Sequence, residues 1–125
     1  MRAIREVMST HLVTIRPSAM VIDAARAMAK GGVGSVLVME GEAILGVFTE
    51  RDIMRALAHR SDAGRVSSVA KWMTPDPVTI APDATVGEAL DRMLDGGFRH
   101  LPVMEGSTPV GIVSMRDLAR SMSKG

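Results

Sequence analysis

Two short stretches of the sequence share a pattern of residues that can bind a ligand at a helix start. Residues 46–52 read GVFTERD, and residues 111–117 read GIVSMRD. Each stretch places a hydroxyl side chain three residues before an aspartate. At a helix N-terminus these groups join free backbone amides and the positive end of the helix dipole, which together attract phosphate. A carboxylate in the first turn can also accept hydrogen bonds from the two hydroxyls of a ribose.

The same spacing also fits a structural capping box. Thr49 would accept a hydrogen bond from the amide of Asp52, while the Asp52 carboxylate accepts one from the amide of Thr49. Ser114 and Asp117 would form the equivalent pair. Taken alone, the motif favours this interpretation, because helix starts of this composition are common. Both roles are compatible, since Asp52 need not direct its carboxylate to its own helix.

No other residues have the spacing of a catalytic or metal site. His11, His59 and His100 lack ligand spacing, and the sequence has no cysteine. No Ser/His/Asp triad and no glycine-rich phosphate loop can be assembled. A nucleotide held at helix starts without a base or a metal would be bound and not turned over. We therefore expect a protein that is not an enzyme and requires no cofactor.

The composition is that of a folded domain with nearly balanced charge. Of the 125 residues, 46% are hydrophobic. The sequence has 15 basic and 14 acidic residues, and this balance excludes a strongly basic nucleic-acid surface. The aromatic residues are Phe48, Trp72 and Phe98, too few for stacking on single-stranded nucleic acid. Neither a signal peptide nor a membrane-spanning segment is indicated. We expect a cytoplasmic protein that binds neither nucleic acid nor membrane.

The two motifs belong to a repeat of 65 residues, the offset from Asp52 to Asp117. With the same offset and no gap, VTIRP at 13–17 matches VTIAP at 78–82, and VMEG at 38–41 recurs at 103–106. So long an ungapped match indicates two copies of one unit. We assign residues 1–60 and 66–125 to the two copies and the polar residues 61–65 to a linker.

Each copy has the hydrophobic pattern of a β-α-β-β-α unit. In the first copy we expect a strand at 12–15, a helix capped by Ser18, a hairpin of strands at 35–39 and 43–48, and a last helix starting at Thr49. Asp83 and Ser114 hold the two helix-start positions in the second copy. We expect Ile53 and Leu57 to face inward from the last helix of the first copy.

The expected fold class is therefore α/β (α+β), with two motifs packed in pseudo-twofold symmetry around a shared core. A copy of about sixty residues buries little surface alone, so the two should pack face to face. Such packing would leave clefts, which are favoured ligand sites. Trp72 should fill the seam between linker and core, with stacking on an adenine as the alternative.

This organisation resembles the CBS domain, and a tandem pair of such domains is called a Bateman module. The resemblance rests on the repeated Gly-apolar-x-(Ser/Thr)-x-x-Asp motif, on Val-Thr-Ile-x-Pro and on the paired glycines, and it covers essentially the whole chain. It implies a regulatory module that binds AMP, ADP, ATP, NAD or S-adenosylmethionine in clefts between the two motifs. It also implies a homodimer formed through helices, with Met54, Leu57 and Met122 on the last helices, and an effector protein that the sequence does not identify.

The resemblance implies that each ligand site uses residues of both copies. The first site would consist of Thr49, Asp52, Met73, Val78, Arg99 and His100. The second would consist of Ser114, Asp117, Met8, Val13, Gly34 and Ser35. In both sites the hydroxyl and the aspartate would contact ribose and phosphate, and the methionine and valine would frame the adenine.

The phosphate ends of the two implied sites differ in charge. Arg99 and His100 can form charge-assisted hydrogen bonds with phosphate, whereas Gly34 and Ser35 cannot. We therefore expect the Thr49/Asp52 site to hold phosphorylated ligands more tightly. The alternative to a ligand sensor is a structural dimerisation or scaffolding module whose Ser/Thr-x-x-Asp motifs are only helix caps.

Overall fold

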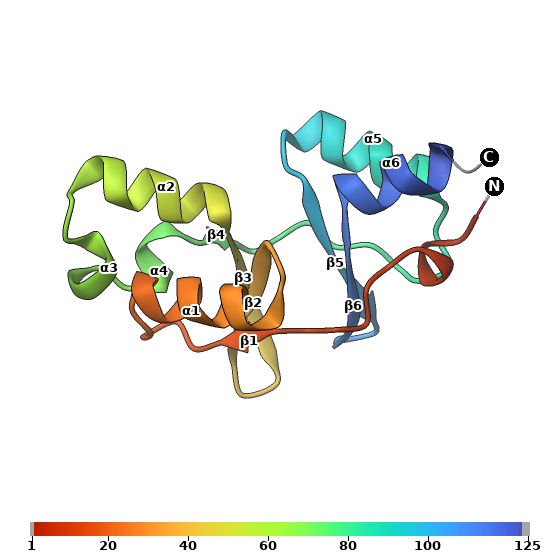
Figure 1. The fold of residues 1–125 in the computed structure, drawn as a ribbon. Helices are drawn as coiled ribbons and strands as arrows, with labels where there is room; N and C mark the ends of the chain where they lie inside the picture. Colours follow the sequence, from red (N-terminus) through yellow and green to blue (C-terminus); the bar gives the residue numbers. More distant parts are fainter. Residues whose placement is uncertain (1, 124–125) are drawn as a thin grey trace. The chain divides into compact units, whose positions relative to one another are not determined.

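A computed structural model describes residues 2–123 and divides the chain into two compact units (Figure 1). One unit comprises Val13–Pro77. The other combines the N-terminal residues up to Leu12 with the residues from Val78 onward. The compact units therefore do not coincide with the sequence repeats: the residues before each repeat's first strand pack with the other repeat.

The Val13–Pro77 unit is built on a four-stranded sheet in the order β1-β2-β3-β4. Its elements are β1 (Thr14–Ile15), α1 (Val21–Gly31), β2 (Ser35–Glu40), β3 (Ala43–Thr49), α2 (Glu50–His59), α3 (Ala63–Val66), α4 (Val69–Trp72) and β4 (Thr74–Pro75). β1 runs parallel to β2, while β3 pairs antiparallel with both β2 and β4. The short β4 closes the edge of β3 that β2 leaves free.

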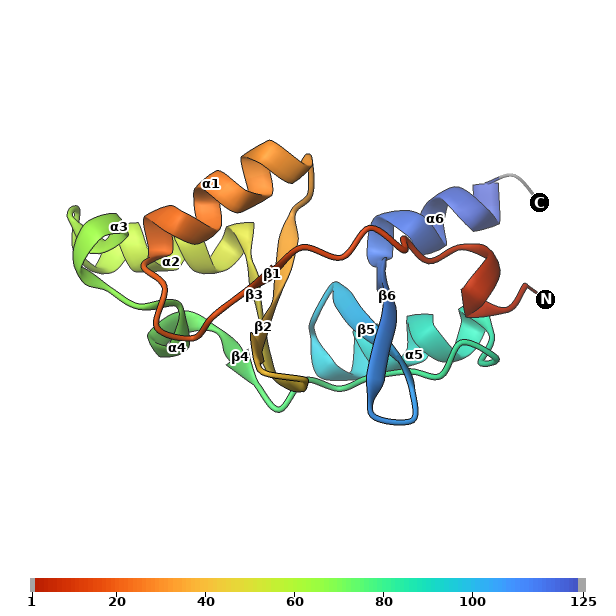
Figure 2. The ribbon, with the colours of Figure 1, turned by 90° about the horizontal axis from the view of Figure 1, so that it is seen from below.

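The second unit repeats this arrangement with shorter edge segments. Its elements are η1 (Ile4–Glu6), α5 (Val86–Gly96), β5 (His100–Glu105), β6 (Thr108–Ser114) and α6 (Met115–Ser123). Ile80 forms a parallel bridge to Val103 of β5, and Ser9 forms an antiparallel bridge to Ile112 of β6. In Figures 1 and 2 the N-terminal segment accordingly passes beside β6. Both units thus have the same order of four paired segments, and the last segment comes from the start of the other copy, ahead of that copy's first predicted strand.

The predicted β-α-β-β-α order is confirmed in the first copy. In the second copy the predicted α-β-β-α part is confirmed, and the first strand is reduced to the bridge between Ile80 and Val103. Helix α1 is followed by Gly32 at φ 66° and α5 by Gly97 at φ 70°. This left-handed conformation suits glycine, which explains the paired glycines of the repeat. Among residues 2–123, no helix is both long and apolar enough to cross a membrane.

The predicted caps of the first helix in each copy were placed two residues too early. Helix α1 begins after Met20, whose amide donates to the Asp23 carboxylate over 3.0 Å. Helix α5 begins after Thr85, whose hydroxyl accepts from the amide of Glu88 over 3.2 Å. Ser18 and Asp83 instead lie in the turns that follow β1 and Ile80.

One further expectation differs from the structure in α2, and α3 adds a feature that was not predicted. Leu57 is 45% exposed, while Ala56 is fully buried and faces the core in its place. Within the stretch 61–65, assigned to the linker, α3 begins at Ala63, which is fully buried. The small side chain of Ala63 fits against the core of its unit, a contact that a polar, turn-rich composition does not reveal.

Each unit has its own hydrophobic core on one face of its sheet. In the Val13–Pro77 unit, the buried core residues are Val21, Ala24, Met28, Val36, Val38, Phe48, Ala56, Ala63 and Val69. In the other unit, they are Ile4, Ile80, Val86, Ala89, Met93, Leu101, Val103, Val113 and Leu118. These cores include the apolar residues that recur at helical spacing in the sequence of α1 and α5: Val21, Ala24 and Met28, and Val86, Ala89 and Met93. Ile4 shows why the N-terminal segment stays with its unit, since it is fully buried.

Candidate functional site

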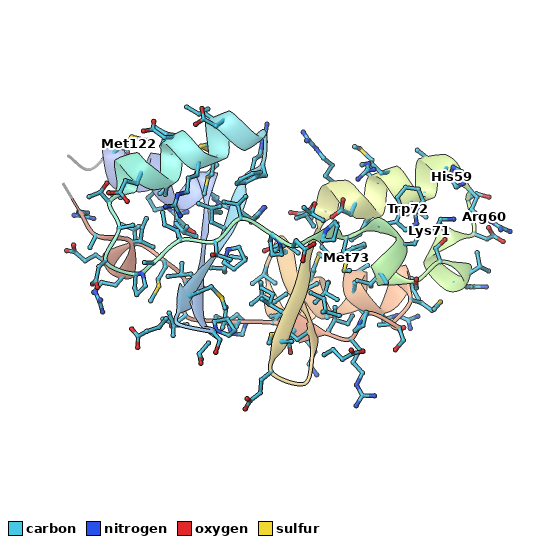
Figure 3. The ribbon with its side chains drawn as sticks, turned by 180° about the vertical axis from the view of Figure 1, so that it is seen from behind. His59, Arg60, Lys71, Trp72, Met73 and Met122 are labelled. Atoms are coloured by element: carbon cyan, nitrogen blue, oxygen red, sulfur yellow. The ribbon has the colours of Figure 1, made fainter. Side chains whose placement is uncertain are left out.

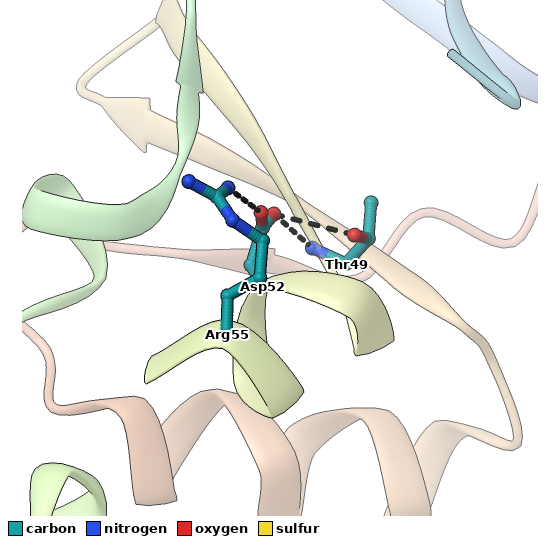
Figure 4. A network of polar contacts seen from close by, with 3 residues as sticks. All are labelled: Thr49, Asp52 and Arg55. Carbon is teal, nitrogen blue, oxygen red and sulfur yellow. Dashed lines mark hydrogen bonds and ion pairs between the residues drawn. The ribbon is translucent and has the colours of Figure 1, made fainter. Parts of the chain in front are cut away.

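The Thr49/Asp52 motif forms the start of α2, and its carboxylate is turned toward its own helix. Asp52 is only 4% exposed. Its Oδ2 accepts hydrogen bonds from the Thr49 amide over 2.9 Å and from the Thr49 hydroxyl over 3.3 Å (Figure 4). The capping interpretation is therefore confirmed for the carboxylate of the first motif.

The Ser114/Asp117 motif makes the reciprocal capping box at the start of α6. The Ser114 amide donates to Oδ2 of Asp117 over 2.9 Å, and the Asp117 amide donates to the Ser114 hydroxyl over 3.1 Å. The second carboxylate is half-buried. Both aspartate carboxylates thus accept a capping hydrogen bond from their own helix start. A ligand would have to bind the carboxylate alongside this capping bond or replace it.

The hydroxyl residue of each motif pairs with the first residue of the neighbouring strand, β2 in the first copy and β5 in the second. Ser35 pairs with Thr49 across β2 and β3, and the Glu50 amide donates to the Gly34 carbonyl over 3.2 Å. In the other unit, His100 pairs with Ser114, and the Met115 amide donates to the Arg99 carbonyl over 2.8 Å. Within its own unit, therefore, Thr49 has the neutral Gly34 and Ser35 as neighbours, whereas Ser114 has the basic pair.

The glycine that opens each motif leaves space for a methionine from the start of the other copy. A Cβ atom on Gly46 would lie 2.7 Å from Sδ of Met73 and 2.7 Å from the Thr74 carbonyl oxygen. On Gly111 it would lie 2.6 Å from Sδ of Met8. Sequence analysis proposed no role for these glycines, whose need for space is set by a segment far away in the chain.

The two predicted sites each draw residues from both units. Of the first set, Thr49, Asp52 and Met73 belong to the Val13–Pro77 unit, and Val78, Arg99 and His100 belong to the other. Of the second set, Met8, Ser114 and Asp117 share one unit, and Val13, Gly34 and Ser35 share the other. Val78 is 47% exposed, and Val13 packs partly buried against the core of its own unit. The grouping of each set of six stays a prediction.

Arg55 is a residue beside the first motif that sequence analysis missed. Its Nη1 lies 3.2 Å from Oδ1 of Asp52, in an ion pair between a side chain that is 56% exposed and one that is 5% exposed. The guanidinium carbon also lies 5.7 Å from the ring centroid of Trp72, within cation–π range. The three-residue spacing of Asp52 and Arg55 on a helix could have indicated the ion pair.

Trp72 is the last residue of α4, and its ring lies near the side chains of His59 and Lys71 (Figure 3). The rings of His59 and Trp72 are 5.5 Å apart and tilted by 59°. Nζ of Lys71 lies 5.7 Å from the Trp72 centroid. Trp72 also packs partly buried against the core. Its contacts are thus with side chains of its own unit.

A hollow of about 590 Å³ lies elsewhere in the same unit, at the end of β2 away from Thr49. It is lined by Thr14, Ile15, Arg16, Pro17, Ser18, Met39, Glu40 and Gly41. None of the predicted site residues lines this hollow. Within the described part of the chain, no three His, Asp or Glu side chains are grouped closely enough to hold a metal ion.

Comparison with known families identifies the repeat. A sequence model of the CBS domain matches residues 4–59 and again residues 66–124. The chain belongs to the CBS domain family. A 17.7 kDa protein of Acidianus ambivalens is 36% identical over 121 residues, which cover 95% of this chain and 72% of the relative. The Meiotically up-regulated gene 70 protein of Schizosaccharomyces pombe is 41% identical over 106 residues, which cover 83% of this chain and 14% of the relative.

Solved structures of CBS domain proteins share the fold. The CBS-domain containing protein ATU1752 from Agrobacterium tumefaciens is 28% identical, with a TM-score of 0.89 and coverage of 97% of this chain and 99% of that one. The CBS domain pair of MJ0100, in complex with 5-methylthioadenosine and S-adenosyl-L-methionine, has a TM-score of 0.88 at 22% identity, with 98% and 97% coverage. A hexameric CBS-CP12 protein from bloom-forming cyanobacteria is 28% identical, with a TM-score of 0.87 and coverage of 95% and 70%.

Proposed function

We propose that this CBS pair is a regulatory module that binds an adenosine-containing ligand and transmits its occupancy by a change of conformation or of oligomeric state. The observation that carries the proposal is the duplicated helix start. Both halves of a CBS pair keep a hydroxyl, an aspartate and a glycine in register, at the entrances of α2 and α6. AMP, ADP, ATP, NAD and S-adenosylmethionine all carry the ribose that these groups suit.

A capped carboxylate still has acceptor positions that a ribose hydroxyl can use. The capping hydrogen bond in the second motif uses Oδ2 of Asp117. A carboxylate has acceptor positions on both oxygens, so one ribose hydroxyl can bind while the cap persists. The helix amides and dipole would favour a phosphate at the same entrance. MJ0100 supports this proposal because a protein of the same fold holds two adenosine derivatives.

Ligand occupancy could act on assembly through the exposed apolar side chains of the last helices. Met54 and Leu57 on α2 are 62% and 45% exposed, and Met122 on α6 is 51% exposed. We propose that these side chains pack in a homodimer or larger assembly, as the hexameric CBS-CP12 protein forms. A ligand that binds one arrangement better shifts the population toward it.

A thermal-shift screen tests the proposed function. The purified protein is heated with millimolar AMP, ADP, ATP, NAD or S-adenosylmethionine, and one of them should raise the melting temperature. At a ligand concentration of 100 times Kd, mass action adds about 2.7 kcal/mol of stability, which is several degrees for a small domain. The Asp52→Asn/Asp117→Asn double variant keeps a cap acceptor at each helix and should lose the shift.

The alternative function is a scaffolding module, and the capping bonds of both aspartates favour it. In that case the motifs are fully explained by helix stability, and the exposed apolar side chains by self-association. Absence of any shift with all five compounds would support the scaffold and contradict the sensor. A shift that persists in the double variant would place the ligand elsewhere.

A further inference from the structure

The two helix starts differ in one ion pair. In the first motif, Nη1 of Arg55 lies 3.2 Å from Oδ1 of Asp52 while Oδ2 accepts the capping bonds, so both oxygens of this buried carboxylate are engaged (Figure 4). Arg120 occupies the equivalent place in α6, 65 residues on. Within residues 2–123, no ion pair joins Arg120 to Asp117.

Trp72 explains why Arg55 stays beside Asp52. The guanidinium lies 5.7 Å from the Trp72 centroid, and the ring is held against the core and between the basic side chains described above. Among residues 2–123 the buried indole nitrogen of Trp72 has no hydrogen-bond partner, so the ring is positioned by its packing and its ring contacts. The residue 65 positions before Trp72 is Val7, which offers a guanidinium no aromatic face.

Ribose binding at the first motif would weaken this ion pair, because both the ribose and Arg55 use the carboxylate of Asp52. A ribose hydroxyl that binds Oδ1 of Asp52 competes with the guanidinium of Arg55 for that oxygen. A neutral nucleoside has no anionic group that could replace the carboxylate as a partner of Arg55. A phosphate on the same ligand can bind Arg55, because this side chain is more than half exposed and a guanidinium has five N–H donors suited to phosphate.

We propose that Arg55 is a specificity-determining residue, which makes the Thr49/Asp52 motif select phosphorylated adenosine ligands over neutral ones. The Ser114/Asp117 motif, without this ion pair, should discriminate less. The inference rests on the proposed function, because it assumes that Asp52 binds a ribose. It is independent of Arg99 and His100, because Arg55 lies on the same helix as the aspartate it contacts.

Isothermal titration with two probes, AMP and adenosine, tests the inference. The starting protein is the full chain with Asp117→Asn, which removes the carboxylate of the second motif but keeps a cap acceptor. Arg55→Gln in this background should reduce the preference for AMP over adenosine by about tenfold, the size expected for loss of a charge-assisted hydrogen bond. Adenosine affinity should stay the same or rise, because its competitor for Asp52 is gone.

Three further variants separate specificity from a structural role. Arg55→Lys keeps the charge and should retain part of the preference. Arg120→Gln is the matched control at the equivalent position and should leave the AMP-to-adenosine ratio unchanged. Trp72→Phe keeps an aromatic core contact but weakens the cation–π interaction, and it should lower the ratio less than Arg55→Gln does.

The outcomes distinguish the two levels of the proposal. If AMP and adenosine both bind and Arg55→Gln leaves their ratio within twofold, or weakens both equally, Arg55 has only a structural role and the inference is overturned. If neither compound binds the starting protein or the unmodified chain, the proposed function fails for these ligands, and the inference fails with it.

Discussion

Ser9 and Ile112 exchange two backbone hydrogen bonds of 2.9 Å each, from the amide of each residue to the carbonyl of the other. This pair adds the N-terminal segment to the edge of β6. Its counterpart in the other unit is β4, which pairs with β3 through Thr74 and Val47. Both sheets are therefore completed by chain that lies far away in the sequence.

Replacing Ser9 with proline should destabilise the unit that contains β6. Proline has no amide hydrogen, so the Ile112 carbonyl loses its donor, and we expect the free energy of unfolding to fall by about 1–3 kcal/mol. Urea denaturation would measure this loss. Ser9→Ala keeps the backbone donor and loses only the hydroxyl that accepts from the His11 amide. Equal midpoints for the two variants would show that the bridge contributes little.

Alanine at Gly46 or Gly111 should also destabilise the fold. The new methyl group would meet the Thr74 carbonyl oxygen at 2.7 Å in the first case and the Ser9 carbonyl oxygen at 2.9 Å in the second. Overpacking of this kind typically costs about 1–3 kcal/mol. Gly64→Ala is the control, because its methyl group would have Ile22 at an ordinary 3.5 Å. Thermal unfolding should show a clear fall for the first two variants and none for the control.

The Arg60–Asp62 pair predicts a local pH dependence. A hydrogen bond from Arg60 is the main cause that lowers the pKa of Asp62, with a smaller contribution from the arginine's charge. Because the folded-state pKa is lowered, any stabilisation is present above the ordinary carboxyl range and is lost as the pH falls through the lowered value. NMR titration of the Asp62 carboxyl should show its pKa rise toward the ordinary value in Arg60→Gln. An unchanged pKa would contradict the pairing.

The charge difference between the implied sites gives a prediction for ligand binding. With AMP or ATP as the titrant, Asp52→Ala should weaken binding more than Asp117→Ala, because Arg99 and His100 are predicted to serve the Thr49/Asp52 site. Calorimetric titration of both variants measures the two losses, and circular dichroism checks that α2 and α6 survive loss of their caps. A larger loss from Asp117→Ala would refute the predicted assignment.

The repeat in the sequence was sufficient to predict the order of elements, because hydrophobic periodicity and paired glycines are local signals. Val21, Ala24 and Met28 face the core as their spacing indicates. Helix boundaries were less predictable, since both Ser18 and Asp83 look like caps. The structure selects Met20 and Thr85, where the side chains of Asp23 and Thr85 meet backbone amides.

Contacts between distant segments could not be read from local patterns. Gly46 and Met73 are 27 positions apart in the sequence, and their contact follows from the pairing of β3 with β4. Trp72 was expected at a seam between linker and core, but no spacing rule places Arg55 over its ring. The ion pair of Arg55 with Asp52 could have been predicted from their three-residue spacing on a helix. The capping hydrogen bond of Asp52 was predicted, because the motif alone favoured the capping interpretation.

The exchange of edge segments has a consequence for synthesis on the ribosome. Residues 13–77 can complete their unit while the second repeat is still being translated. The N-terminal segment, although made first, finds its partner only after Ile112 has left the exit tunnel. At about 5–20 residues per second, Ile4 and its neighbours wait several seconds with an apolar side chain exposed, an interval in which a chaperone could bind the nascent chain.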